Sequence, residues 1–362
     1  MKKKILFLVN HDIVIYNFRR EIVEKFLDEG YEVIISSPYG ERIDELVELG
    51  AIFEEVEIDR HGKNVFSELK LILYYKKLLK KIKPDYIFGF TIKPNIYGAL
   101  VAKQMGIPFV ANITGLGSAV ENKGILQLIS VLLYKVSFSK IQTVFFQNKE
   151  NMDFFIEKNI AVGKHKQLPG SGVNLKHFEP LSYPNEETID FVFISRIMKE
   201  KGIDQYLEAA AYIKKKYPTT KFHICGFCEE SYEEILREYQ KNKIIIYHGM
   251  VKDVREILKK THCTVHPTYY PEGLSNVLLE SAACSRPIIT TNRSGTREVV
   301  EENINGFFVK TKDTSSLIEK LEKFILLNHD AKKDMGVNGR IKVETQFDRS
   351  IVVNAYLSEL EK

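Results

Sequence analysis

At 362 residues the chain is too long for one ordinary core, and 44% hydrophobic residues suffice for two domains of about 150–180 residues each. No stretch reaches the ~20 apolar residues of a membrane span, and the N-terminus lacks the pattern of a secretory signal. From these features we expect a cytoplasmic protein rather than an integral membrane or exported one. The net charge is +4, and its excess lies between Arg60 and Lys103, which favours an anionic partner.

Short apolar runs alternate with helical patterns along the whole chain. In the first half we predict strands at 5–9, 32–35, 85–88, 109–111 and 143–146 and helices at 18–27, 68–82 and 96–105. In the second half the predicted strands are 191–194, 222–225, 244–247, 263–265 and 287–289. Nearly continuous apolar strands separated by helices predict parallel sheets covered on both faces. The predicted fold is α/β, with two Rossmann-like, doubly wound domains that face a central cleft.

A turn-rich segment at 168–174, followed by Pro180 and Pro184, separates the two halves. We therefore predict an N-terminal domain at 1–180 and a C-terminal domain at 181–345. The last helical pattern, within 346–362, is predicted to pack back on the N-terminal domain.

Polar segments follow three predicted strands of the first half. In doubly wound sheets, ligands gather at the carboxyl ends of the strands. The candidate contacts in this half are His11 after the first strand, Lys93 and Asn95 after the strand at 85–88, and Thr114 and Gly115 after the strand at 109–111.

The segment 272–280 places two glutamates eight residues apart, one before and one within a predicted helix. Gly273 and Ser275 suit the entry of that helix, whose first N–H groups and dipole form an anion site. At ~1.5 Å per residue, Glu280 lies only ~6–8 Å along the axis from those amides, about the distance from a diphosphate to a ribose hydroxyl pair. Glu272 would reach the opposite end of the same ligand.

Arg196 and Lys201 flank the first turn after the strand at 191–194. A guanidinium fork and an ammonium would complete the neutralisation of a diphosphate, so no Mg²⁺ is required. Together with the helix start, these residues predict a site for a nucleotide diphosphate-sugar, with no metal and no further cofactor.

Single features have plainer explanations. A glutamate near a helix start is common for dipole reasons alone, and Arg196 and Lys201 would also suit a solvated loop. The apolar run around Glu280 is harder to explain, because an unpaired buried carboxylate is costly. His248 and His266 are lone histidines without metal-ligand spacing, and the CxxC at 225–228 has no second pair.

The two segments together resemble a known family. Glu272-Gly-Leu-Ser-Asn-Val-Leu-Leu-Glu280 resembles the E-x7-E motif of retaining GT-B glycosyltransferases, and Arg196-Ile-Met-Lys-Glu-Lys201-Gly202 resembles their R-x4-K-G. The likeness covers essentially the whole chain and is to glycosyltransferase family 4. Segments 91–98 and 112–117 are similar to those of bacterial members that extend polyprenyl-diphosphate-linked sugars for capsule, O-antigen or glycoprotein glycans.

The resemblance implies a retaining hexosyl- or N-acetylhexosaminyltransferase that takes an N-acetylhexosamine or galactose-type sugar from a UDP-sugar. It implies that Arg196 and Lys201 hold the diphosphate, that Glu280 binds the ribose hydroxyls, and that Glu272 acts at the sugar. The catalytic candidates are therefore Glu272, Arg196 and Lys201. Backbone contacts of the donor are implied at Gly273, Leu274, Ser275 and Asn276, and around Val251 for the nucleoside. The candidates in the first half become the acceptor side, where the chain departs from the family at Ile92 and in the glycine-free loop 10–16.

A lipid-linked acceptor implies peripheral association with the anionic inner face of the bacterial cytoplasmic membrane. The segment 67–83 carries six lysines on a helical pattern, and 124–134 is strongly apolar. Either one could lie on lipid or simply cover the sheet. No nucleic-acid partner is expected.

Three other classes remain as alternatives. A nucleotide-sugar 2-epimerase shares the two-domain build but needs no acceptor site. A nicotinamide dehydrogenase would need G-x-G-x-x-G after the first strand, where the chain has VNHDIV. A non-catalytic two-domain ligand-binding protein would bind without turnover and would normally be exported.

Overall fold

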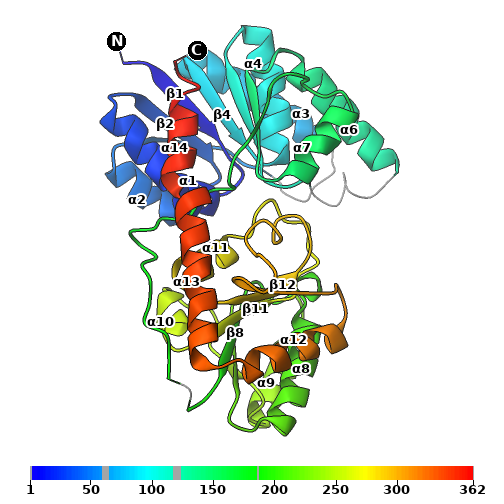
Figure 1. Cartoon of the computed structure of the whole chain (residues 1–362). Coiled ribbons are helices and arrows are strands. Elements are labelled where there is room, and N and C mark those ends of the chain that lie inside the picture. Colours follow the sequence, from blue (N-terminus) through cyan, green and yellow to red (C-terminus); the bar gives the residue numbers. More distant parts are fainter. Residues whose placement is uncertain (1, 59–64, 117–123, 186, 362) are drawn as a thin grey trace. The chain divides into compact units, whose positions relative to one another are not determined.

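The computed structural model describes residues 2–58, 65–116, 124–185 and 187–361. The chain divides into two compact units, one formed by Met1–Ser171 with Ser350–Lys362 and the other by Gly172–Arg349 (Figure 1). The division falls nine residues before the boundary expected after residue 180. Val173 explains the difference, because it is buried in a core cluster of the second unit and its N–H donates to Phe347.

The first unit is built on a seven-stranded parallel sheet in the order β3-β2-β1-β4-β5-β6-β7. Its strands are β1 (Lys4–Leu8), β2 (Glu32–Ser37), β3 (Ile52–Glu55), β4 (Tyr86–Phe90), β5 (Phe109–Ile113), β6 (Thr143–Phe146) and β7 (His165–Gln167). Its helices are α1 (Asp12–Asp28), α2 (Arg42–Glu48), α3 (Val65–Ile82), η1 (Pro94–Gly98), α4 (Ala99–Met105), α6 (Ile125–Ser137), η2 (Phe138–Lys140), α7 (Lys149–Glu157) and α14 (Arg349–Leu357).

Two apolar cores lie on opposite faces of this sheet. One joins it to α3, α4, α6 and α7, and the other joins it to α1, α2 and α14. The central strands are buried along their whole length, as Phe109–Ile113 illustrates. Because helices cover both faces of such strands, the side chains on both faces are apolar, and apolar and polar residues do not alternate along the strand.

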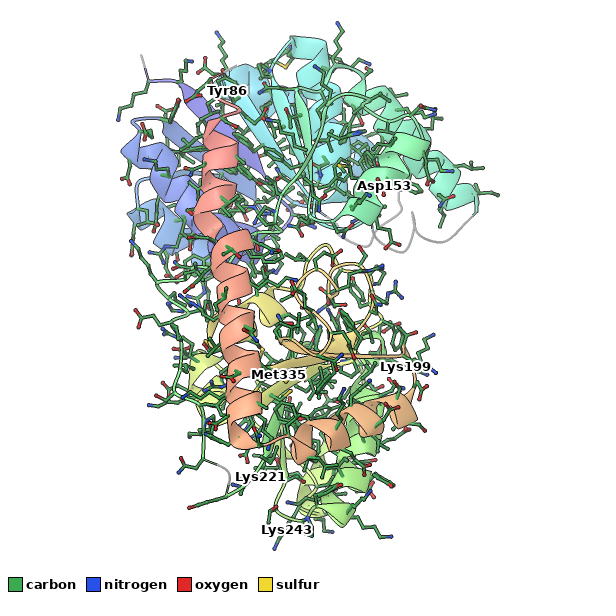
Figure 2. All side chains as sticks on the ribbon, in the orientation of Figure 1. Tyr86, Asp153, Lys199, Lys221, Lys243 and Met335 are labelled. Carbon is green, nitrogen blue, oxygen red and sulfur yellow. The ribbon has the colours of Figure 1, made fainter. Side chains whose placement is uncertain are left out.

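The second unit has a six-stranded parallel sheet in the order β10-β9-β8-β11-β12-β13. Its strands are β8 (Asp190–Ile194), β9 (Lys221–Cys225), β10 (Ile246–Tyr247), β11 (Cys263–His266), β12 (Ile288–Thr291) and β13 (Gly306–Val309). Its helices are η3 (Lys199–Lys201), α8 (Ile203–Lys216), α9 (Glu233–Lys241), α10 (Arg255–Leu258), α11 (Asn276–Ala283), α12 (Thr314–Leu326) and α13 (His329–Gln346). Met335 of α13, labelled in Figure 2, lies in the core shared with α8 and α12.

Both sheets reverse their strand order once, between β1 and β4 in the first unit and between β8 and β11 in the second. The carboxyl ends of strands at such a reversal leave room for a ligand. The prediction of two doubly wound parallel-sheet units is confirmed. No described helix has the length and apolarity that a membrane crossing needs.

Helix α1 begins at Asp12, six residues before the predicted start at 18. The side chain of His11 accepts the N–H of Ile13 at 3.2 Å and so caps the helix. The predicted helix at 96–105 is instead split into η1 and α4, and Gly106 ends it in the left-handed conformation.

Candidate active site

Arg196 and Lys201 lie after β8, beside the reversal of the second sheet. The chain turns through η3 into α8, and Gly202, at φ +81°, makes the junction. A Cβ at Gly202 would stand 2.3 Å from the carbonyl oxygen of Pro267, so the position requires glycine. This close approach brings the turn after β8 against the segment after β11.

The two cations share one aromatic ring. The guanidinium carbon of Arg196 lies 5.3 Å and the ammonium of Lys201 4.7 Å from the centre of Tyr270. Arg196 also pairs with Glu229, and Lys201 is buried. The cations are therefore held side by side at the strand ends, as neutralisation of a diphosphate requires.

Glu272 pairs with Lys201 and lies 3.5 Å from the imidazole of the buried His266. Burial disfavours the carboxylate, but Lys201 and His266 outweigh that cost and lower the pKa of Glu272 to about 2. Burial lowers the pKa of His266. Glu272 is thus an ionised carboxylate at neutral pH, with a lysine as its counter-ion.

Helix α11 begins four residues after Glu272 in the sequence. Ser275 is the N-cap residue, and its side chain makes no capping hydrogen bond. Its own N–H donates to the carbonyl of Gly295 at 2.8 Å, which fixes the loop. The side chain of Leu274 points into the core, so Leu274 can offer a ligand mainly its backbone. Backbone contacts of the donor at Gly273, Ser275 and Asn276 stay a prediction.

Glu280 lies one helical turn into α11. Among the described residues its carboxylate has no hydrogen-bond or ion-pair partner, and Arg349 is the one cation that favours its charge. Burial raises the pKa of Glu280 to about 7. A carboxylate kept without a protein partner at this place is available to a ligand.

Val251 packs on the same apolar cluster as Ile194, which precedes Arg196, and Val277 of α11. It follows β10, the edge strand, and its side chain is half-buried against the cluster around Cys284. The preceding loop is fixed by Gly249, whose carbonyl accepts the N–H of Gly226 at 2.8 Å. Its assignment to the nucleoside stays a prediction.

The candidates of the first unit all follow strands around its reversal point. Lys93 pairs with Glu68 at 2.6 Å, and Asn95 is buried with its amide donating to the carbonyl of Asn112 at 2.8 Å. Thr114 and Gly115 are half-buried at the end of β5. Gly117 of the same motif, like Arg60, lies outside the described residues. Asn95 therefore supports the loop from inside rather than facing solvent.

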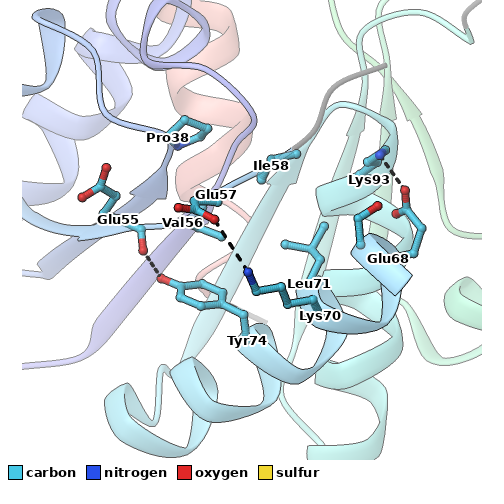
Figure 3. Close-up of a pocket in the computed structure, with 11 residues that line it drawn as sticks. Pro38, Glu55, Val56, Glu57, Ile58, Glu68, Lys70, Leu71, Tyr74 and Lys93 are labelled. Carbon is cyan, nitrogen blue, oxygen red and sulfur yellow. Dashed lines mark hydrogen bonds and ion pairs between the residues drawn. The ribbon is translucent and has the colours of Figure 1, made fainter. Parts of the chain in front are cut away.

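A cavity of about 700 Å³ opens at this end of the first sheet (Figure 3). Figure 3 shows it between the segment after β3 and the start of α3, with the Lys93–Glu68 pair at one side. The hydroxyl of Tyr74 closes another side by donating to the carbonyl of Glu55 at 2.6 Å. The cavity thus combines an apolar wall with charged groups, as a site for a polar ligand does.

Four residues around these sites were not among the predicted site residues. Tyr270, His266 and Gly295 reach the donor-side cluster only through the fold, and a Cβ at Gly295 would lie 2.7 Å from the Cβ of Glu272. Thr91, beside the predicted Lys93, holds φ +67°, which is strained for a β-branched residue and typical of functional loops. The position after a strand was the available signal for Thr91.

Two family models match the two units separately. The model of group 1 glycosyl transferases matches residues 178–342, and that of 4-like glycosyl transferases matches residues 4–148. The chain belongs to glycosyltransferase family 4. This family 4 glycosyltransferase is 28% identical to an N,N'-diacetylbacillosaminyl-diphospho-undecaprenol alpha-1,3-N-acetylgalactosaminyltransferase of Campylobacter jejuni, with 98% of this chain and 97% of that protein aligned.

A second relative is the UDP-Gal:alpha-D-GlcNAc-diphosphoundecaprenol alpha-1,3-galactosyltransferase of Escherichia coli, at 24% identity over 71% of this chain and 70% of that protein. The crystal structure of Anabaena HepE in complex with UDP and glucose matches the fold with a TM-score of 0.80 at 16% identity, covering 99% of each chain. The GT-B fold and the glycosyltransferase activity follow, and the 2-epimerase alternative does not hold. Among the described residues no group of three or more His, Cys, Asp or Glu is placed to hold a metal ion.

Proposed function

We propose that this glycosyltransferase moves an N-acetylhexosamine or galactose-type sugar from a UDP-sugar to a polyprenyl-diphosphate-linked saccharide, with retention of the α configuration. One observation carries the donor assignment: the pair of cations after β8 lies at the start of α11, and Glu280, which has no partner among the described residues, lies farther down the same helix. The two relatives named above supply the substrate class.

In the proposed complex the donor diphosphate binds at the α11 N-terminus and replaces Glu272 as the main partner of Lys201. Glu272 is then free to accept hydrogen bonds from the transferred sugar. Glu280, four residues after Asn276 and so ~6 Å along the axis, accepts from the ribose hydroxyls. The charge of the diphosphate is met by Arg196, Lys201 and the helix start, so we propose that no metal ion is needed.

The proposed reaction is a displacement on one face of the sugar. The bond from the anomeric carbon to the diphosphate oxygen breaks, the bond to the acceptor oxygen forms, and the acceptor proton passes to the leaving phosphate. The chain contributes charge stabilisation of the leaving group and positioning, and no carboxylate forms a covalent bond to the sugar.

The acceptor is assigned to the first unit, with His11, Lys93, Thr114 and Gly115 as contacts and Asn95 as their support. Because this acceptor carries a lipid, we also infer peripheral association with the inner face of the cytoplasmic membrane. Capsule, O-antigen or glycoprotein glycan synthesis is the setting that such an acceptor implies.

The test is the release of nucleotide from a panel of UDP- and GDP-sugars by the purified protein. With the best donor, Arg196→Ala should lower kcat/KM at least tenfold, or about 1.4 kcal/mol, because the leaving diphosphate loses a charge contact. The matched control is Lys199→Ala, which removes an exposed lysine of the same turn (labelled in Figure 2) and should act like wild type.

Nucleotide release should persist in EDTA. Equal loss in the Arg196→Ala and Lys199→Ala variants, or no loss in either, would refute the donor assignment. Dependence on added Mg²⁺ would refute the metal-free neutralisation while leaving the transferase assignment intact.

A further inference from the structure

The outer face of α6 is apolar and exposed. Ile125, Leu128 and Leu132 are 76%, 69% and 62% exposed, and the residues exposed beside them are Leu126, Ile129 and Val136. Only Tyr134 and Ser137 of this helix are buried. A contiguous apolar face of this kind on a folded domain indicates an interaction surface.

The orientation of α6 is fixed from its inner side. The ring of Tyr134 lies 5.1 Å from the rings of both Phe138 and Phe155, in edge-on contacts within the core. The ammonium of Lys103 in α4 also donates to the carbonyl of Val136 at 3.0 Å. Because these contacts hold the helix, its apolar face cannot turn inward.

The helices that share a core with α6 differ in charge: α3 and α4 carry an excess of lysine, whereas α7 carries Glu150, Asp153 and Glu157. Helices α3, α4 and α6 cover the same side of the first sheet, on one shared core (Figure 1). Residues 69–84 contain six lysines and no acidic residue, and neither 86–116 nor 124–149 contains an acidic residue. Lys76, Lys77 and Lys80 are exposed and, among the described residues, form no ion pair.

We propose that the outer face of α6 inserts into the headgroup region of an anionic phospholipid bilayer, with the lysines of α3 contacting lipid phosphates. At 13 residues α6 is too short to span a bilayer, so it lies along the surface. An apolar helix on the same side of the sheet as the unpaired lysines of α3 matches both components of such a surface. The inference rests on the proposed function only in that a lipid-linked acceptor requires the chain to reach a membrane.

The experiment is co-sedimentation of the whole protein with phosphatidylcholine vesicles that contain or lack phosphatidylglycerol. The double variant Leu128→Glu/Leu132→Glu should bind at least about tenfold less to both, because it charges the inserted face. The triple variant Lys76→Ala/Lys77→Ala/Lys80→Ala should lose only the gain that phosphatidylglycerol gives, and salt should remove that gain in wild type.

The control is Leu326→Glu/Ile341→Glu, two exposed apolar residues of the second unit, which should bind as wild type. Melting curves confirm that each variant is folded. Unchanged vesicle binding of Leu128→Glu/Leu132→Glu would overturn the proposal. A wild-type dimer that this variant converts to a monomer would also overturn it, because the face would then join two copies of the chain.

Nucleotide release separates this proposal from the proposed function. The α6 variants should release nucleotide from the soluble donor at the wild-type rate, because the donor cluster belongs to the second unit. Vesicle binding without any nucleotide release would support the α6 face and refute the donor assignment.

Discussion

At the scale of single residues, the donor cluster holds two carboxylates with opposite properties. Lys201 and His266 lower the pKa of Glu272 to about 2, whereas burial raises the pKa of Glu280 to about 7. The difference follows from the ion-pair partners, because within the described part of the chain Glu272 has a cation in contact and Glu280 has none. A site that leaves one half-buried acid without a partner among the described residues loses stability and retains a group for its ligand.

Replacing Glu280 should therefore change how stability depends on pH. Between pH 4.5 and about 7 the folded chain keeps a proton on Glu280 that the unfolded chain releases, so wild-type stability falls as pH rises. Glu280→Gln cannot ionise and should exceed wild type by up to about 3 kcal/mol at pH 8, with no difference at pH 4. Urea unfolding of the ligand-free proteins at both pH values measures this.

The exposed Glu256→Gln is the control and should follow wild type at both pH values. A Glu280→Gln variant that is equally less stable than wild type at pH 4 and pH 8 would contradict the prediction. Such a result would mean that the carboxylate has a stabilising partner.

At the scale of elements, the site depends on turns that bring segments closer than side chains allow. Gly202 lies against Pro267, and Gly295 lies against Glu272. Both have positive φ, at +81° and +90°. These two glycines set how closely the loops after β8, β11 and β12 approach one another, and so where the cations lie.

Gly202→Ala should destabilise the protein more than Gly163→Ala does. Both glycines have φ near +80°, so both substitutions add the strain of a left-handed alanine, about 1–2 kcal/mol. Only Gly202 also meets backbone atoms, which should add about 1–3 kcal/mol, whereas nothing lies within 4 Å of a Cβ at Gly163. Urea midpoints measure the difference, and equal losses in the two variants would show that the close approach costs nothing.

At the scale of the whole molecule, the end of the chain belongs to the first unit, although the second unit precedes it in sequence. Tyr356 of α14 contacts Asn112 and lies 3.2 Å from the guanidinium of the buried Arg19. Asn112 in turn accepts from Asn95 at 2.8 Å. The last helix thus supports the loop that carries the predicted acceptor contacts.

Glu359 holds the end of the chain at the start of β6 with a buried carboxylate. It pairs with Lys166 at 2.7 Å and accepts from Thr143 at 2.6 Å and from Gln142 at 3.0 Å. Glu359→Ala should cost about 1–3 kcal/mol of unfolding free energy, because Thr143 and Gln142 lose a buried acceptor. The exposed Glu361→Ala should cost little, and equal urea midpoints for both variants would contradict the assigned role.

Local patterns in the sequence determined the fold class of this protein and the candidates for its donor site. The central strands of both sheets are apolar runs, and these runs predicted the fold class. The segments 196–202 and 272–280 contain charged residues at fixed spacing, and this spacing gave the candidates for the donor site. Three edge or short strands, β3, β7 and β13, were not predicted, and β10 is shorter than predicted. A strand such as His165–Gln167 has no apolar pattern in the sequence, because its residues are not buried and it forms only through hydrogen bonds to the neighbouring strand.

Only the tertiary structure decided which partners meet. It pairs Lys201 with Glu272 across 71 residues and places Tyr270 beside both cations. It also leaves Glu280 without a partner among the residues that the structure describes. It also packs one side of α6 and exposes the other, although the helix is apolar nearly throughout. Periodicity records which residues avoid water, whereas contacts between distant segments depend on how the strands are ordered, and that order has no local signature.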